Sequence, residues 1–255
     1  MVEMQQDYFF SGKESARREA FEHVWSNDLN DIFADLADYY DKANFVASLG
    51  LMDWFHARFI DTIDLTNAHH VLDVCTGTHA VSMALLKRKP DLEIHAIDRS
   101  AAMLKVGAEM AQKEGMTIQS LQGDAHELPF PDNHFDLVTL QFASRHLRIM
   151  LAFDEIKRVL KPGGYFYHCD MLRPNNKLVA HAYYTFLKAS LTATACVFGS
   201  TKTALNSRDY FLNVLRMFYS APELSKLLNE LGFDSIDHMS VFGGMLGFHK
   251  AMKPI

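Results

Sequence analysis

Val71-Leu72-Asp73-Val74-Cys75-Thr76-Gly77-Thr78-His79 is the segment on which the predicted architecture rests. It opens with a short β-rich run, continues through an acidic residue and a loop of mostly small residues, and leads into the helical pattern of residues 80–88. A strand, a small-residue loop and a helix in this order place backbone N–H groups and a helix N-terminus beside the polar end of a ligand. The segment therefore predicts a ligand site at the end of this strand.

Strand-like and helical patterns alternate on both sides of that segment, over residues 70–172. Such alternation predicts right-handed βαβ crossovers and a mostly parallel sheet. Two more strands follow at 233–241 and 244–252, joined through Phe242-Gly243-Gly244, so we expect a hairpin that makes the last strand antiparallel. The sequence thus predicts an α/β, Rossmann-like sheet of seven strands, the first five covering HVLDVC (70–75), LEIHAID (92–98), MTIQSLQ (116–122), FDLVTLQF (135–142) and YFYHCDM (165–171).

Helical patterns flank the sheet region and define the domain prediction. Residues 1–64 read as a helical N-terminal cap, with an apolar stripe at Leu29, Ile32, Phe33, Leu36 and Tyr40. Residues 65–255 form the main domain, with a helical insertion at about 174–220. The insertion carries a run of apolar and aromatic residues, namely Tyr183, Tyr184, Phe186, Leu187, Leu191 and Phe198. They could form a simple core or line an apolar site. Both interpretations predict that these side chains are buried.

The composition excludes several classes of protein. Apolar residues make up 49% of the chain and charged residues 22%, the balance of a globular protein, and the net charge of −6 argues against a nucleic-acid binder. The cysteines Cys75, Cys169 and Cys196 lack a CxxC spacing, so we expect reduced thiols and no metal site. The N-terminal residues lack the apolar run of a signal peptide, and no stretch approaches the length of a membrane span. We therefore expect a cytoplasmic protein.

Acidic residues end the first three predicted strands at Asp73, Asp98 and Asp124, the last within Gly123-Asp124-Ala125. Each alone has an ordinary alternative, namely a strand-end acid, a helix-capping group beside Ser100 and a turn residue. Together they match the adenosine-recognition device of doubly wound sheets, in which a carboxylate binds the ribose hydroxyls outside the carboxyl ends of the strands. The first loop keeps a single glycine, Gly77, where such loops often carry three.

Beyond these acids, the chain resembles the class I S-adenosylmethionine-dependent methyltransferases from about Phe33 to Pro254. Within them it is similar to the branch that C-methylates quinone precursors in ubiquinone and menaquinone biosynthesis. The resemblance rests on YDKAN at 40–44 with Ser48 and Trp54, AAMLKVG at 101–107, ELPFPDNHFD at 127–136, RVLKPGG at 158–164 and GGMLGFH at 243–249.

The resemblance implies which residues hold S-adenosylmethionine and release S-adenosylhomocysteine. The first loop supplies Asp73, Thr76 and Gly77, and the second strand supplies the ribose acid Asp98 with the adjacent Arg99. Other implied contacts are the adenine-packing residue Met103, the adenine-edge residues Gly123, Asp124 and Ala125, and the wall near the reactive methyl, Gln141 and Phe142. The chain departs from the branch at Cys75 and His79 in the first loop, at Phe142-Ala143-Ser144-Arg145-His146 and at Asp170-Met171-Leu172.

Methyl transfer to a phenolic ring requires an ionised hydroxyl, hence a positive group or a base beside it. Arg145 is a candidate for stabilising the phenolate, His146 for taking the proton and Asp170 for orienting either group. The ordinary alternatives are a salt bridge at the rim of the sheet for Arg145 and a satisfied or solvated histidine for His146.

Three functions remain open from the sequence. The first is C-methylation of a quinol or related phenolic ring, whose acceptor is aromatic and apolar. The second is O- or N-methylation of another small metabolite, and the third is a non-catalytic S-adenosylmethionine-binding accessory protein. We expect no nucleic-acid partner. Peripheral contact with a membrane and a homodimer are further expectations.

Overall fold

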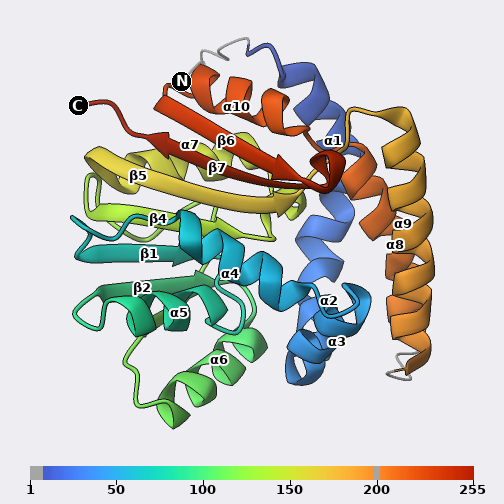
Figure 1. The fold of residues 1–255 in the computed structure, drawn as a ribbon, viewed down its shortest axis with the longest axis horizontal. Helices are drawn as coiled ribbons and strands as arrows, with labels where there is room; N and C mark the ends of the chain where they lie inside the picture. The colour runs from blue at the N-terminus through green and yellow to red at the C-terminus, as the bar shows by residue number, and fades with distance from the viewer. Residues whose placement is uncertain (1–7, 198–201) are drawn as a thin grey trace.

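The computed structural model describes residues 8–197 and 202–255, without the side chains of residues 195–207. Phe198 and the thiol of Cys196 lie outside this described part. The strands are β1 (His70–Val74), β2 (Glu93–Asp98), β3 (Gln119–Gln122), β4 (Phe135–Gln141), β5 (Leu160–Met171), β6 (Asp234–Val241) and β7 (Leu246–Met252). They form one sheet in the order β3-β2-β1-β4-β5-β7-β6 (Figure 1).

The first five strands are parallel, and β7 runs antiparallel to both β5 and β6. A short 3-10 turn at Phe242–Gly244 joins β6 to β7, with Gly243 at a φ of 68° and Gly244 at 91°. Glycine adopts these left-handed conformations without a steric cost. The predicted seven-stranded, mostly parallel sheet with an antiparallel last strand is therefore confirmed.

Neighbouring residues of each central strand point to opposite faces of the sheet and build two cores. Leu72 and Val138 pack with helices α7 (Ile149–Val159) and α10 (Ala221–Glu230). Val71 and Leu137 pack on the other face with α4 (Met52–Thr62) and α5 (Ala80–Arg88). Because both faces are covered, the central strands carry apolar residues on both faces, as parallel strands between helices do.

The predicted cap and insertion are helical. The cap contains α1 (Ser11–His23), the π-helix η1 (Val24–Asp28), α2 (Leu29–Leu36), the 3-10 turn η2 (Ala37–Tyr39), α3 (Tyr40–Ala47) and α4. The insertion contains α8 (Lys177–Val197) and α9 (Lys202–Arg216). Helix α6 (Ala101–Lys113) begins with the predicted cap residue, since the Ser100 side chain accepts the Met103 N–H.

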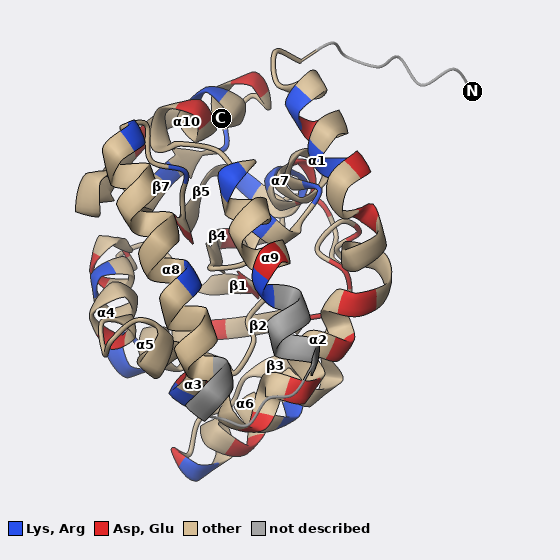
Figure 2. Cartoon of the chain, turned by 90° about the vertical axis from the view of Figure 1, so that its right-hand side faces the viewer, with Lys and Arg blue, Asp and Glu red and all other residues tan. Residues whose placement is uncertain are grey.

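Helices α2 and α3 of the cap lie with the insertion beyond the carboxyl ends of the parallel strands, whereas α4 covers one face of the sheet (Figure 1). Helices α8 and α9 stand upright there, with α2 and α3 beside them (Figure 1), and Figure 2 shows them in front of the strand ends. A small apolar core joins the two regions, in which Phe21, Trp25 and Leu29 of the cap pack against Tyr210 and Val214 of α9. Residues distant in sequence thus enclose the edge of the sheet at which ligands bind in this class of fold.

Candidate active site

Asp73 ends β1 beneath the first loop and is 1% exposed. Its Oδ1 accepts a hydrogen bond from Thr139 Oγ1 at 2.8 Å, and its Oδ2 accepts from Thr76 Oγ1 and Ser82 Oγ, each at 2.7 Å. Three hydroxyl donors from three different elements therefore satisfy this buried carboxylate. This placement favours a role in fixing Thr76 and the start of α5 over direct contact with a cofactor.

The first loop alternates through left-handed backbone conformations, with φ of 54° at Cys75, 57° at Gly77 and 63° at His79. Such values are uncommon outside glycine. The buried His79 fits because Gly107 of α6 faces it: a Cβ on Gly107 would stand 2.7 Å from His79 Cγ. His79 Nε2 also shares a hydrogen bond with Ser120 Oγ at 3.2 Å. The histidine that departs from the family pattern thus braces the loop against α6 and β3.

Asp98 ends β2 beside this loop. Its Oδ2 accepts the Gly77 N–H at 2.9 Å and its Oδ1 the Ser100 N–H at 2.8 Å, and burial raises the pKa of the carboxyl group. A carboxylate offers about four lone-pair sites, more than these two N–H groups use. The remaining capacity of a half-buried carboxylate fits the hydroxyl groups of a ribose.

Asp124 lies after β3 and is held by His126. Its Oδ1 accepts the His126 N–H at 2.9 Å and the ring Nδ1–H at 2.5 Å. His126 Nε2 accepts the Arg148 N–H at 3.0 Å, so the ring proton must be on Nδ1. These bonds lower the pKa of Asp124. Among the described residues none donates to Oδ2, which leaves this oxygen for a donor such as the adenine amino group.

Four further predicted residues surround this edge. The Met103 Cε atom lies 3.3 Å from where a Cβ on Gly77 would stand, and Ala125 is buried. Gly123 packs so closely that a Cβ there would lie 2.7 Å from Ile97 Cδ1. Arg99 instead reaches the cap, where its Nη1 donates to the Trp25 carbonyl at 2.9 Å.

The end of β4 carries the wall residues and leads to the loop of the predicted catalytic pair. Gln141 Oε1 lies 3.0 Å from Nδ1 of His56 on α4. Phe142 follows at a φ of 57°, with its N–H donating to the Cys169 carbonyl at 2.8 Å. This left-handed residue turns the chain into the 3-10 turn η3 (Ser144–His146).

Arg145 and Asp170 form a buried ion pair. The guanidinium Nη1 of Arg145 donates to Asp170 Oδ1 and, at 2.7 Å, to the Phe142 carbonyl. Asp170, fully buried, also accepts Ser144 Oγ–H at 2.6 Å and the Arg145 N–H at 3.1 Å on Oδ2. Burial, the largest single influence, would lower the pKa of Arg145, but the charge and hydrogen bond of Asp170 together with Tyr40 and Tyr183 raise it above its usual value. The predicted pairing of Asp170 with a catalytic candidate is therefore seen for Arg145.

His146 points away from its neighbour. Tyr210 Oη accepts the Trp25 Nε1–H at 3.1 Å and shares a hydrogen bond with His146 Nδ1, 2.6 Å away. The ring packs edge-on against Phe33 and Phe211. Burial, with Arg145 and Arg17 nearby, holds the pKa of His146 well below its usual range. The ring is thus a buried neutral histidine behind the site.

A fully buried arginine of the cap holds the same loop. Arg17 of α1 donates through Nη2 to the carbonyls of Arg145 at 2.9 Å and Leu147 at 3.4 Å. Its Nη1 pairs with Glu14 at 2.5 Å. Sequence reasoning missed this residue and His126, because neither belongs to a motif and the partners of Arg17 are distant in sequence.

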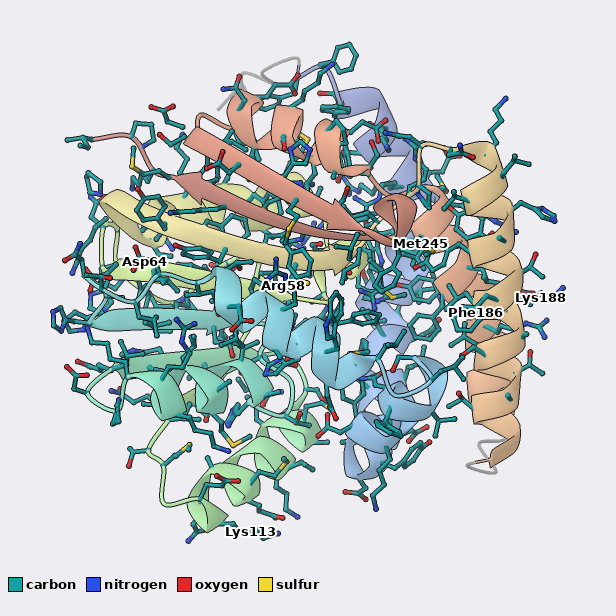
Figure 3. The ribbon with its side chains drawn as sticks, viewed as in Figure 1. Arg58, Asp64, Lys113, Phe186, Lys188 and Met245 are labelled. Atoms are coloured by element: carbon teal, nitrogen blue, oxygen red, sulfur yellow. The ribbon has the colours of Figure 1, made fainter. Side chains whose placement is uncertain are left out.

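A cavity of about 410 Å³ lies between the cap and the insertion. Arg145 and Met171 border it from the sheet, and apolar or aromatic side chains of α2, α3, α4, α8 and α9 form most of its wall. Phe186 lies on the side of α8 that faces the body of the molecule, whereas Lys188 lies on the outer side (Figure 3). Tyr183, Phe186, Leu187 and Leu191 line the cavity, and Tyr184 does not.

The described part of the chain holds no cluster of three or more His, Cys, Asp or Glu side chains suited to a metal ion. Cys75 and Cys169 are free thiols, as expected. Of the helices within residues 8–197 and 202–255, none is both long and apolar enough to cross a membrane.

Relatives of known activity match almost the whole chain. The model of the ubiE/COQ5 methyltransferase family matches residues 22–253. The ubiquinone/menaquinone biosynthesis C-methyltransferase UbiE of Pseudomonas aeruginosa (strain LESB58) is 30% identical over 230 residues, 88% of each chain. The demethylmenaquinone methyltransferase of Staphylococcus carnosus (strain TM300) is 30% identical over 227 residues, 88% of this chain and 92% of the relative.

Solved structures share the fold. A SAM-dependent methyltransferase from Aquifex aeolicus has a TM-score of 0.55 at 20% identity and covers 77% of this chain and 88% of its own. Haemonchus contortus phosphoethanolamine N-methyltransferase 2, in complex with S-adenosyl-L-methionine, has a TM-score of 0.61 at 17% identity, over 88% of this chain and 60% of its own. The unused lone pairs of Asp98 and Asp124 and the braced first loop fit that cofactor. This chain therefore belongs to the ubiE/COQ5 methyltransferase family and is an S-adenosylmethionine-dependent methyltransferase.

Proposed function

We propose that this enzyme methylates a ring carbon of a quinol or related phenol that carries an apolar substituent. The observation that carries the proposal is the cavity between cap and insertion. It has room for an aromatic ring with part of a side chain, its wall is mostly apolar, and the guanidinium group of Arg145 borders it. Apolar pockets with a few convergent polar groups are the usual form of small-molecule sites.

The cofactor, when bound, supplies an electrophilic methyl group on a sulfonium. In this proposal Asp98 accepts the ribose hydroxyls, Asp124 the adenine amino group, and Met103 packs on the adenine ring. Thr76 and Gly77 place the loop around the polar end, with Asp73 holding them from below. Gln141 and Phe142 come at the end of β4, just before the turn that carries Arg145, and in this proposal they form the wall near the transferred methyl.

Arg145 stabilises the acceptor as a phenolate, which makes the ring carbon nucleophilic. When bound, the cofactor would supply the methyl group to that carbon, and the proton of the carbon would then pass to the ring oxygen, which restores the aromatic phenol. Asp170 fixes the guanidinium through the buried ion pair, and the apolar walls exclude water, which strengthens the interaction of the cation with the phenolate.

His146 has a different role in this proposal. Its ring is not among the side chains that line the cavity, and its Nδ1 is bonded to Tyr210. We therefore infer that His146 ties η3 to α9 and that Arg145, not His146, faces the acceptor. A ring that does not line the cavity and whose pKa is held well below its usual range is a poor candidate for a base that must take a proton from the acceptor.

The test is a methyl-transfer assay with demethylated quinols, simple phenols and amines, in which the mass and position of the methyl group are determined. A new carbon–methyl bond on a quinol ring supports the proposal. If the product is a methyl ether or a methylated amine and the quinols do not react, the proposed C-methylation is wrong and the enzyme is an O- or N-methyltransferase.

We also propose that the mouth of the cavity contacts a lipid surface. Leu49, Leu51 and Phe242 line the cavity and are 74%, 43% and 45% exposed, and Trp54 packs against Phe242 with its ring centroid 5.7 Å away. Exposed apolar patches of this kind mark interaction sites. Binding to phospholipid vesicles that weakens in Leu49→Asp but not in the equally exposed Leu178→Asp supports the contact, and equal binding of both variants refutes it. The cytoplasmic location and the homodimer stay predictions, the second of which light scattering tests.

A further inference from the structure

The hydroxyl group of Tyr183 is buried in the cavity wall without a partner. The side chain lies on α8 and is 5% exposed, and its oxygen makes no hydrogen bond with any residue in the described part of the chain. A buried donor that lacks an acceptor costs about 1–3 kcal/mol, so each case calls for an explanation such as a missing ligand or water.

The surroundings of this hydroxyl point to a negatively charged ligand atom. Tyr183 and Arg145 line the same cavity and interact electrostatically. Nη1 of Arg145 is used by Asp170 and the Phe142 carbonyl, but none of the described residues accepts from Nε or Nη2. Two sets of unused donors therefore border one mostly apolar space. An oxygen anion is the ligand that such donors stabilise most.

We propose that Tyr183 donates its hydroxyl hydrogen bond to the acceptor's ring oxygen, beside Arg145, and that the two residues together form an oxyanion site for the phenolate. The inference rests on the proposed function, because it assigns a residue to binding the phenol that the function requires. Tyr183 acts as a donor and keeps its own proton, since burial raises the pKa of its hydroxyl. No bond other than the hydrogen bond forms or breaks at Tyr183.

The neighbouring tyrosine provides a matched control. Tyr184 also has a buried hydroxyl oxygen without a partner among the described residues, but it does not line the cavity, and Arg216 stacks on its ring at 5.2 Å. Tyr183→Phe and Tyr184→Phe each remove one unpaired hydroxyl from the same helix. A general effect on the stability of α8 would appear in both variants, whereas loss of the oxyanion site would appear only in Tyr183→Phe.

The experiment measures the pKa of bound 4-nitrophenol by its absorbance, in the full-length protein saturated with S-adenosylhomocysteine. This probe reports the ionisation of a phenol in the cavity and requires no turnover. We expect the wild type and Tyr184→Phe to bind the phenolate with a lowered pKa. Tyr183→Phe should raise that pKa by about one unit, the size expected for the loss of one hydrogen bond to a charged oxygen. Calorimetry should show S-adenosylhomocysteine affinity within twofold in all three proteins.

Kinetics with an accepted phenol give the second readout. Tyr183→Phe should lower kcat/KM by about tenfold or more and shift the acidic limb of the pH–rate profile to higher pH. Tyr184→Phe should keep the wild-type kcat/KM and pH–rate profile. The proposal is overturned if Tyr183→Phe leaves the pKa of bound nitrophenol unchanged, or if the wild type binds no nitrophenolate. If the nitrophenolate site depends on Tyr183 while no quinol is methylated, the oxyanion site stands and the quinol acceptor is wrong.

Discussion

Replacing Arg17 with methionine tests whether α1 holds the catalytic loop. The guanidinium is fully buried and bonds to Glu14 and to the backbone of the loop that carries Arg145. Removing one member of a buried ion pair typically costs about 3–5 kcal/mol, because the remaining charge is left uncompensated. Glu14 is 14% exposed and keeps a bond from the Tyr219 hydroxyl at 2.8 Å, so we expect the lower end, about 3 kcal/mol.

The double variant Arg17→Met/Glu14→Gln separates the charge from the contacts. It removes the orphaned carboxylate and keeps an acceptor for Tyr219, so it should regain about 2 kcal/mol relative to the single variant. Arg18→Met is the matched control, since Arg18 is exposed and its i,i+4 pair with Glu22 should contribute under about 0.5 kcal/mol. The free energy of unfolding in urea gives all three values.

Activity then reports on the loop. The double variant still lacks the donors to the carbonyls of Arg145 and Leu147, so kcat should fall by about tenfold while the affinity for S-adenosylhomocysteine stays within twofold. The reasoning fails if Arg17→Met costs less than about 1 kcal/mol, or if the double variant is as unstable as the single one. Full kcat in a folded double variant would show that the loop does not depend on α1.

Other expectations follow from the site. Asp98→Ala should weaken S-adenosylhomocysteine binding at least tenfold in calorimetry, through the loss of about 1.5–3 kcal/mol of charged hydrogen bonds, and the exposed control Asp91→Ala should not. Arg145→Gln should lower kcat about 10²-fold without weakening the binding of the cofactor. Arg145→Lys should keep only part of the activity, because an ammonium group lacks the planar, forked set of donors of a guanidinium. His146→Ala should keep the wild-type pH–rate profile. Loss of the acidic limb in that variant would show that His146 acts as the general base. Burial lowers the pKa of His168 and His249 to about 3, so the native state binds fewer protons than the unfolded chain below pH 6.5, and stability should fall as pH drops from 6.5 towards about 4.5. His249→Asn should reduce that slope by about 1.4 kcal/mol per pH unit in urea titrations, and an unchanged slope would contradict the reasoning.

Local patterns were sufficient to predict the sheet and the acids at its edge. Asp73 stands next to the last residue of β1, β2 ends at Asp98 and β3 ends two residues before Asp124, and parallel topology brings these ends to one edge. The same patterns could not show which carboxylate remains available. Asp73 is saturated by Thr139 and Ser82, and those partners lie on other elements, so the distinction from Asp98 depends on tertiary structure.

The catalytic candidates show a similar limit. Arg145 and His146 are adjacent, and the sequence suggests a joint role, but the 3-10 turn directs the arginine to the cavity and the histidine to Tyr210. Tyr183 shows the converse. A stripe of aromatic residues along a helix predicts burial whether it packs in a core or lines a cavity, so only the folded structure, in which Tyr183 borders the cavity and Tyr184 does not, distinguishes the two.

Arg17 shows how far the active-site loop depends on residues that no local pattern marks. It stands next to the exposed Arg18 in a helix rich in charge, where arginine is expected at the surface. Its partners are carbonyl groups 128 and 130 residues away, and it lies before residue 22, where the match to the family model begins. Trp25, in the π-helix that follows, reaches the same loop through Tyr210 and His146. Two independent contacts from the N-terminal segment thus converge on η3, so the cap not only borders the cavity but also sets the position of the Arg145 guanidinium beside it.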